Sequence, residues 1–381
     1  MSVKKINLVT VVGTRPEIIR LSKVINRLTK SNAFNHTLIH TGQNYDYELN
    51  EVFFEDLNLK KPDYFLGSVG KTPSETIGNI LIKIDKLFHK LEPDAILILG
   101  DTNSCLCAIP AKKRKIPIFH IEAGNRCFDQ RVPEEVNRKI IDHISDINLT
   151  YSHIAREYLL REGMSPDRVI KIGSPMMEIL SHNEVAINDS KILSKLKLKK
   201  DNYFLVSSHR EENIDNVSNF SLFKNMLESL SKEFSLPIIV STHPRTMKAL
   251  GKDNGKLDEN INFLKPFGYF DYVKLQQNAK VVLSDSGTIT EESSILNFKA
   301  LNIREVHERP EGMEEASVMM TGLDYLRVKQ ALDVLETQSV NQNRNISIVK
   351  DYNVDNFSLK VERIILSYID FINRVVWQKE S

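Results

Sequence analysis

The chain has 381 residues, 41% of them hydrophobic and 27% charged, which is typical of a folded protein long enough for two domains. Its 51 lysines and arginines balance 50 aspartates and glutamates, so no broad basic surface for nucleic acid or an anionic membrane is expected. The three cysteines lack CxxC spacing, the first apolar run ends at Gly13, and no segment has the roughly 20 apolar residues of a membrane span, so we expect a cytoplasmic protein with reduced thiols.

Short runs rich in Val, Ile and Leu alternate along the chain with longer stretches of helical period. This alternation predicts parallel βαβ units and therefore the α/β class. The first series of predicted strands covers residues 6–12, 37–41, 95–99, 116–121, 146–150 and 169–172. The second series covers residues 203–207, 237–242, 261–264, 279–283 and 300–303.

Residues 174–202 separate the two series, are rich in Lys, Ser and Asn, and contain no clear strand. They predict a boundary between a first domain of residues 1–175 and a second domain of residues 200–358. The last helical pattern, within residues 359–381, fits both a helix that completes the second domain and one that returns to the first.

The sequence GTRPE at residues 13–17 follows the first predicted strand and precedes a helical pattern. Thr14 and Glu17 have the spacing of a capping box, and Pro16 suits a first helical turn. Free N–H groups at such a helix start attract anions, and Arg15 offers a bidentate partner for phosphate. The motif therefore predicts a phosphate-binding turn, with an ordinary capped helix and a surface arginine as the alternative.

A second motif of this kind, SDSGTITEE at residues 284–292, follows a strand of the second series. Thr288 and Glu291 repeat the capping spacing. Because ligands of open α/β sheets bind outside the carboxyl ends of the strands, both motifs stand where a diphosphate is expected. Two well-capped helices without a ligand are the alternative.

Acidic motifs mark the first domain: GDTNS with Asp101 and HIEAGNR with Glu122 each follow a strand, and VPEEVNR adds Glu134 and Glu135. Carboxylates at strand ends of one domain are expected to converge on a cleft. A carboxylate buried beside others tends to have a raised pKa, which suits a general acid or base near neutral pH. Helix capping is the competing role, and for Glu135 it is the favoured one.

Three basic motifs follow strands of the second series: SHREEN with His209 and Arg210, THPR with His243, and HERPE with Arg309. A single histidine of this kind is more often packed or solvated. Histidines in three similar positions, His209, His243 and His307, together predict a polar wall of a cleft. No pair has the HExxH or HxxxH spacing of metal ligands, so no metal site is expected.

Two common nucleotide-binding motifs are missing. GSVGKT at residues 67–72 lacks the first glycine of a P-loop because Phe65 occupies that position. No two glycines are separated by a single residue, so the dinucleotide fingerprint GxGxxG is missing as well. We therefore expect no NAD or other bound cofactor.

The motifs GTRPE, GDT, HIEAGNR, PEEVNR, SHREEN, DSGTITEE and ERPE, in this order and over nearly the whole chain, resemble those of the non-hydrolysing UDP-N-acetylglucosamine 2-epimerases. The resemblance implies two Rossmann-like domains in a GT-B arrangement, with the site in the interdomain cleft. It also implies a homodimer that inverts C2 of a UDP-linked 2-acetamido sugar by eliminating UDP to a glycal and adding it back.

The resemblance assigns roles residue by residue. Asp101, Glu122 and Glu134 match the acid and base candidates, and His209 is also a stabiliser of the departing phosphate. The implied substrate-binding residues are Arg15, Arg20, Arg210, His243, Phe267, Tyr272, Ser286, Gly287, Thr288, Glu292 and Arg309. Arg15, His209, Ser286 and Gly287 would hold the diphosphate. Glu292 would hold the ribose, with Phe267 and Tyr272 near the uracil.

Some positions depart from the commonest family members. Arg20 stands where they usually carry Lys, Thr288 follows DSG where a second Gly is usual, and the segment between Glu122 and Glu134 is shorter. NRCFDQRVPEEVNRK and NIREVHERPEGMEEASVMM are most similar to the branch that makes UDP-N-acetyl-L-fucosamine from UDP-2-acetamido-2,6-dideoxy-L-talose for surface polysaccharides. Interconversion of UDP-GlcNAc and UDP-ManNAc is the next alternative, followed by a GT-B glycosyltransferase and a sugar-nucleotide sensor without catalysis.

Overall fold

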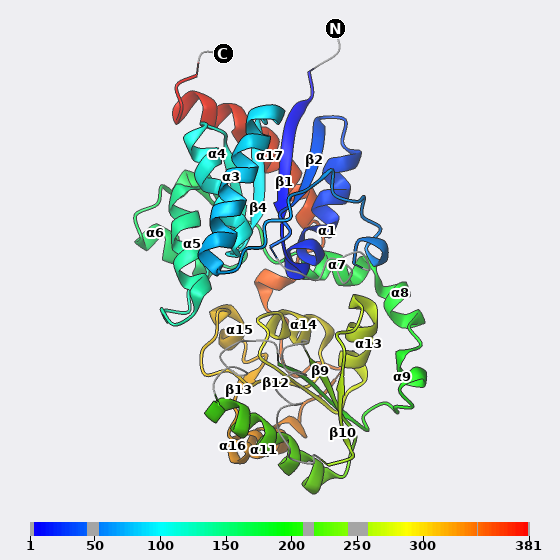
Figure 1. The fold of residues 1–381 in the computed structure, drawn as a ribbon. Coiled ribbons are helices and arrows are strands. Elements are labelled where there is room, and N and C mark those ends of the chain that lie inside the picture. The colour runs from blue at the N-terminus through cyan, green and yellow to red at the C-terminus, as the bar shows by residue number, and fades with distance from the viewer. Residues whose placement is uncertain (1–3, 44–52, 209–216, 243–257, 341, 380–381) are drawn as a thin grey trace. The chain divides into compact units, whose positions relative to one another are not determined.

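The computed structural model describes residues 4–43, 53–208, 217–242, 258–340 and 342–379. The chain divides into two compact units (Figure 1). The first unit is Met1–Ser181 with Val354–Ser381, and the second is His182–Asn353. Among the helices in these described stretches, none is long and apolar enough to cross a bilayer.

The first unit is built on a parallel sheet of seven strands within the described residues, in the order β3-β2-β1-β4-β5-β6-β7. The strands are β1 (Ile6–Val12), β2 (Phe34–His40), β3 (Tyr64–Phe65), β4 (Ala95–Leu99), β5 (Ile118–Ile121), β6 (Ile147–Thr150) and β7 (Val169–Lys171). The direction of strand addition reverses between β1 and β4. This switch point is where ligands bind in doubly wound sheets.

Helices cover both faces of this sheet, which is why its strands read as continuous apolar runs. They are α1 (Arg15–Lys30), α3 (Pro73–Leu91), α4 (Ala108–Lys113), α5 (Pro133–Ile144), α6 (His153–Arg161), α7 (Met176–His182) and α17 (Phe357–Val375), with the 3-10 turns η1 (Asn103–Cys107) and η2 (Pro166–Arg168). Val9 and Ile96 pack against α3 and α4, while α1 and α17 pack together on the other face (Figure 1).

The C-terminal helix α17 belongs to the first unit, one of the two positions that its sequence pattern allowed. The Arg27 guanidinium of α1 pairs with Glu362 at 2.9 Å. Glu178 accepts a hydrogen bond from the backbone N–H of Ser358 at 2.8 Å, and Phe357 packs edge-on against Tyr151. The apolar stripe of α17 is therefore buried by the unit that contains the N-terminus.

The second unit has a parallel sheet of six strands in its described part, in the order β10-β9-β8-β11-β12-β13. They are β8 (Phe204–Ser208), β9 (Ile238–Thr242), β10 (Ile261–Leu264), β11 (Val281–Ser284), β12 (Ala300–Asn302) and β13 (Met319–Met320). The helices are α8 (Glu184–Asp189), α9 (Ile192–Lys195), α11 (Val217–Phe234), α13 (Tyr269–Asn278), α14 (Thr288–Leu296), α15 (Pro310–Glu314) and α16 (Tyr325–Leu335), with the turn η3 (Lys350–Tyr352).

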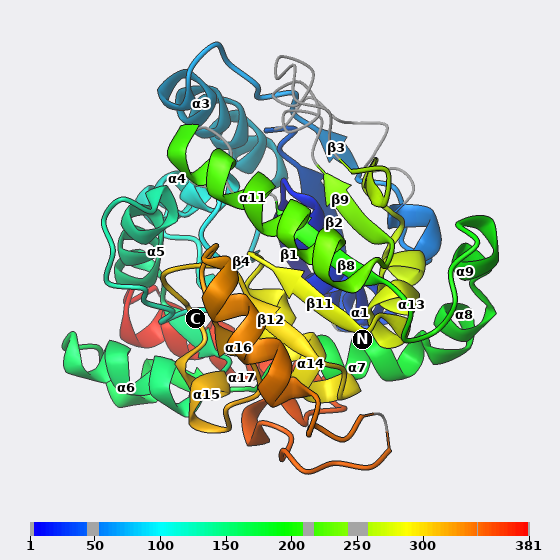
Figure 2. The ribbon, with the colours of Figure 1, turned by 90° about the horizontal axis from the view of Figure 1, so that it is seen from below.

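Alternating residues of each strand serve two separate cores in this unit. Val206 and Leu283 face α11 and α16, whereas Leu205 and Val282 face α9, α13 and α14 (Figure 2). The switch point of this sheet lies between β8 and β11. The two sheets confirm the predicted α/β class with two Rossmann-like domains.

The structure differs from the predicted elements at the sheet edges. The strands β3 and β13 were not predicted, because two residues carry no readable period. Strand β2 begins at Phe34, three residues before the predicted start. Residues 174–202 contain no strand, as predicted, and include the short helices α7, α8 and α9.

Two histidines of β2 make the stability of the first unit depend on pH. Burial lowers the pKa of His40 to about 4, and burial with nearby Lys60 lowers the pKa of His36 to about 4. Since both folded pKa values lie below the ordinary value of about 6.5, protonation favours the unfolded chain. Each of the two histidines therefore lowers the free energy of unfolding by about 3 kcal/mol as the pH falls from about 6.5 to 4, because the unfolded chain binds the proton first.

We predict that His40→Asn flattens this pH dependence. Asn removes the titrating ring but keeps an acceptor for the backbone N–H of Gly42, which donates to His40 Nδ1 at 3.0 Å. The denaturant midpoint of the variant, measured from pH 7 to pH 4, should fall less steeply than that of the natural protein. Parallel curves would contradict the assignment of this acid sensitivity to His40.

Candidate functional site

The phosphate-binding turn predicted from GTRPE lies at the switch point of the first sheet, between β1 and the start of α1. The Glu17 side chain reaches back to the backbone N–H groups of Gly13 at 2.9 Å and Thr14 at 2.6 Å, as the capping pattern predicts. Arg15 occupies the first turn, and its guanidinium lies 5.2 Å from the centre of the Phe53 ring. The Glu17 carboxylate thus occupies the N–H groups of Gly13 and Thr14, and Arg15 is the group of this turn that suits an anion.

Asp101 and Glu122 follow neighbouring strands of the same sheet. Strands β4 and β5 pair with Leu99 opposite Ile121, so the loops that carry the two acids leave the sheet at the same edge. Asp101 accepts from the Arg138 guanidinium of α5 at 2.7 Å. The structure therefore brings these two predicted acids to one end of the first unit.

Glu122 is held in an unfavourable backbone conformation. Its φ of 66° lies in the left-handed region, which costs an L-residue roughly 1–2 kcal/mol. Arg20 pairs with its carboxylate at 2.8 Å, and the Asn125 amide donates to it at 3.2 Å. Such strain persists where surrounding contacts over-determine it, most often at functional sites.

The two adjacent glutamates of PEEVNR differ in their surroundings. Glu134 lies in the first turn of α5 and is partly exposed. Glu135 is buried and accepts from Arg138 at 3.0 Å and from the backbone N–H of Cys127 at 3.2 Å. The favoured capping role for Glu135 is therefore replaced by anchorage of the preceding loop to α5.

A buried network behind these acids was missed in the sequence. Asp142 pairs with Arg126 at 2.7 Å and with His120 at 3.0 Å, and His120 bonds through Nε2 to the carbonyl of Gly100 at 2.7 Å. Burial acts to lower the pKa of His120, but Asp142, the Gly100 carbonyl and Asn148 together outweigh it and raise that pKa. A signal was available, because several acids gathered in one region require counter-charges such as Arg138 and Arg126.

The second motif of the sequence analysis starts helix α14 at the switch point of the second sheet. Gly287 is the N-cap, and the hydroxyl groups of Ser286 and Thr288 lie 3.0 Å apart at this end. Buried Asp285 accepts from Ser208 at the end of β8 at 3.1 Å, which ties the two central strand ends together. The predicted residues His209, Arg210 and His243 lie outside the described residues.

The other nucleotide-binding candidates of this unit lie on α13, α14 and the loop before α15. Gln276 of α13 donates to Glu292 of α14 at 2.6 Å. Helix α13 also carries Tyr272 and begins shortly after Phe267, so this bond joins the Glu292 carboxylate to the helix of the proposed uracil contacts. Arg309 is buried, and its Nε lies 3.4 Å from Glu291. Its charge therefore balances a carboxylate within the unit.

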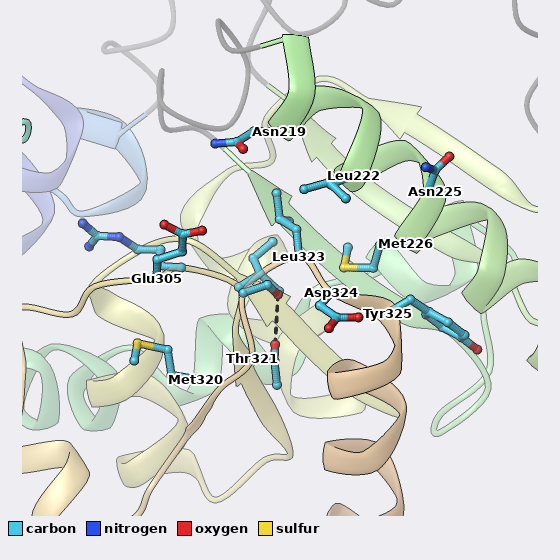
Figure 3. Close-up of a pocket in the computed structure, with 13 residues that line it drawn as sticks. Asn219, Leu222, Asn225, Met226, Glu305, Met320, Thr321, Leu323, Asp324 and Tyr325 are labelled. Atoms are coloured by element: carbon cyan, nitrogen blue, oxygen red, sulfur yellow. Dashed lines mark hydrogen bonds between the residues drawn. The ribbon is translucent and has the colours of Figure 1, made fainter.

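A cavity of about 580 Å³ opens beside the carboxyl ends of β12 and β13, a feature that the sequence did not reveal. Figure 3 shows Asn219 and Leu222 of α11 on one side of it and Thr321 and Asp324 on the other. Glu305 and Asp324 give its wall two carboxylates, while the lining Arg304 pairs with Glu308 at 3.4 Å. Because these acids repel an anion, the α14 N-terminus suits a diphosphate better than this cavity does.

Comparison with known proteins agrees with this geometry. The family model described as UDP-N-acetylglucosamine 2-epimerase matches residues 26–366. The chain belongs to this family. It is 39% identical to the UDP-N-acetylglucosamine 2-epimerase of Methanococcus maripaludis over 82% of this chain and 87% of that protein. The protein is thus an isomerase of the UDP-sugar 2-epimerase type.

Solved structures of the family extend the similarity to nearly the whole length. The UDP-N-acetylglucosamine 2-epimerase of Rickettsia bellii is 52% identical, with a TM-score of 0.93 over 99% of this chain and 100% of that chain. The Methanocaldococcus jannaschii UDP-GlcNAc 2-epimerase, solved with UDP-GlcNAc and UDP, is 33% identical, with a TM-score of 0.88 over 95% and 100%. The predicted GT-B fold class of this epimerase is thereby confirmed.

We predict that Arg20→Met destabilises the epimerase by about 3 kcal/mol, because it leaves the largely buried Glu122 carboxylate without its cation. Adding Glu122→Gln should recover part of this loss, since the orphaned charge is then removed. Thermal and denaturant unfolding of the two single variants and the double variant measure both effects. Arg20→Lys, which keeps the charge, is the matched control, and a double variant no more stable than Arg20→Met would contradict the prediction.

Proposed function

We propose that this protein inverts C2 of a UDP-linked 2-acetamido sugar by eliminating UDP and adding it back. The observation that carries the proposal is the pair of acids, Asp101 and Glu122, that follow neighbouring strands and are each held by an arginine. Fixed carboxylates of this kind suit proton transfer at a sugar carbon. The α14 N-terminus of the second unit supports the nucleotide part of the proposal.

The chemistry explains why such groups are needed. C2 of the sugar is not next to a carbonyl, so its C–H is a poor acid. When the C1–O bond to UDP breaks, C1 gains oxocarbenium character, and loss of the C2 proton to a carboxylate then gives a C1=C2 glycal. A proton delivered to the other face of C2, with return of UDP to C1, completes the inversion. Neither an oxidant nor water is consumed.

We assign the proton transfers to Asp101, Glu122 and Glu134, leaving open which is the acid and which the base. Arg138 and Arg20 fix the directions of the first two carboxylates, which keeps them in a geometry suited to the reaction. For the leaving UDP, we propose that Arg15, His209, Ser286 and Gly287 hold the diphosphate. Glu292 would hold the ribose and Phe267 and Tyr272 the uracil, with Arg20, Arg210, His243, Thr288 and Arg309 as further contributors to substrate binding.

For the sugar, we propose UDP-2-acetamido-2,6-dideoxy-L-talose, with UDP-N-acetyl-L-fucosamine as the product, made in the cytoplasm by a homodimer for surface polysaccharide synthesis. The support is the sequence of the segment Asn125–Val132 before α5 and of the stretch from Asn302 to Met320. UDP-GlcNAc is the second candidate, because the relatives described above carry that name.

We predict that Glu122→Gln lowers C2–H exchange by about 10²- to 10⁴-fold, the usual share of general acid–base catalysis, because the amide cannot transfer the proton. Exchange is followed by mass spectrometry in deuterated water, and UDP affinity by calorimetry should stay unchanged. Glu92→Gln is the matched control, because exposed Glu92 also has a left-handed backbone with φ 44°. Near-normal exchange in Glu122→Gln would remove this residue from the mechanism.

We predict that kcat/KM for UDP-2-acetamido-2,6-dideoxy-L-talose exceeds that for UDP-GlcNAc by more than about 10²-fold. An extra hydroxyl in an apolar pocket is rejected by only about 10²-fold, and the altered ring configuration moves further hydroxyls. Each UDP-sugar is incubated alone, and the C2 epimer is quantified by chromatography. Comparable turnover of UDP-GlcNAc would overturn the proposed sugar, while absence of C2 exchange with both would overturn the epimerase proposal.

A further inference from the structure

The two oxygens of the Glu17 carboxylate accept hydrogen bonds from two different loops of the first unit. Its Oε2 accepts from the backbone N–H groups of Gly13 and Thr14 and from the Thr14 hydroxyl at 2.8 Å. Its Oε1 accepts from the Thr102 hydroxyl at 2.9 Å and lies 3.5 Å from Cys105 Sγ. The residue is only 1% exposed, so protein donors replace water around both oxygens.

These two loops carry the residues to which the proposed function assigns phosphate binding and proton transfer. Strands β1 and β4 are neighbours at the switch point of the sheet. Thr14 immediately precedes Arg15, and Thr102 immediately follows Asp101. One carboxylate therefore fixes the spacing between the two functional loops.

Helix capping alone does not account for this arrangement. Capping at the start of α1 is worth about 1 kcal/mol and is available to a glutamate that stays exposed. Full burial of a carboxylate costs more than this unless several donors compensate it. Burial raises the pKa of Glu17, and the hydrogen bonds from Thr14, Gly13, Thr102 and Cys105 act in the opposite direction. The Oε2 atom of Glu17 thus caps α1, and its Oε1 atom has a second function as the acceptor for the Thr102 loop.

We infer that Glu17 is a positioning residue, which holds the Asp101 loop in register with the Arg15 loop without touching the substrate. The inference rests on the proposed roles of Asp101 and Arg15. Gln43 also holds the Asp101 loop, since its Oε1 accepts from the Ser104 backbone N–H and hydroxyl, both at 2.9 Å. Loss of the Glu17 link therefore shifts Asp101 without releasing the whole loop.

Glu17→Gln tests this link selectively. The two backbone N–H groups require an acceptor, so the Gln oxygen takes the place of Oε2 and preserves the Arg15 loop. The amide NH₂ then faces Thr102, so the bond from the Thr102 hydroxyl to a carboxylate is replaced by a weaker bond between neutral groups with the opposite direction. Thr102→Val removes the bond altogether, and Thr102→Ser is the matched control that keeps the hydroxyl.

We expect Thr102→Val to lower kcat for C2–H exchange by about 10- to 100-fold, the scale of a small misplacement of a reacting group, and Glu17→Gln to lower it by a smaller factor. UDP affinity, measured by calorimetry, should stay unchanged, and kcat is normalised to the UDP-binding sites so that loss of folded protein does not count. The double variant should be no slower than the slower single variant, because both changes act on one bond. Thr102→Ser should restore kcat to near the natural value.

Asp101→Asn separates failure of this inference from failure of the proposed function. If Asp101→Asn loses exchange while Thr102→Val keeps a near-natural kcat, the positioning role is overturned and the proposed function stands. If Asp101→Asn keeps exchange, the proposed role of Asp101 is wrong and the inference falls with it. Should Glu17→Gln fail to fold, the comparison of Thr102→Val with Thr102→Ser decides alone.

Discussion

Parallel strand pairing is the constraint from which the rest of this structure follows. Strands that all run in one direction bring their carboxyl ends, and the loops that follow them, to one edge of each sheet. In the first unit this edge gathers the GTRPE turn and the loops of Asp101 and Glu122. In the second unit it gathers the end of β8 and the start of α14. Residues far apart in the chain become neighbours because of the pairing alone.

Gathering acids at one edge creates an electrostatic problem, and the first unit solves it with buried arginines. Arg138 joins Asp101 to Glu135, Arg20 pairs with Glu122, and Arg126 pairs with Asp142. Removing one of these cations would leave a carboxylate short of a close counter-charge, which costs more than an exposed pair returns. The same arginines fix the directions of the carboxylates, so the device that stabilises the fold also orders the candidate site.

The described edges of the two sheets carry different kinds of polar group. The described edge of the first sheet is rich in carboxylates, which suits proton transfer, whereas the α14 N-terminus presents backbone donors and hydroxyls, which suit a phosphate oxygen. The left-handed backbone of Glu122 is held in place by the contacts of its side chain with Arg20 and Asn125. Family membership and geometry thus support one type of reaction from independent directions.

The sequence by itself determined the class of the fold, the positions of the principal strands along the chain and the placement of acids after β4 and β5. These features are local: an apolar run has a readable period, and a residue after a strand lies at its carboxyl end. The edge strands β3 and β13, the assignment of α17 to the first unit and the pairing of Arg138 with Asp101 were decided only by the tertiary structure. Each depends on contacts between residues distant in the chain, which no local pattern encodes. Glu17 shows both levels, since its spacing predicts the capping of α1, whereas its bond to Thr102 exists only because β1 and β4 are neighbours.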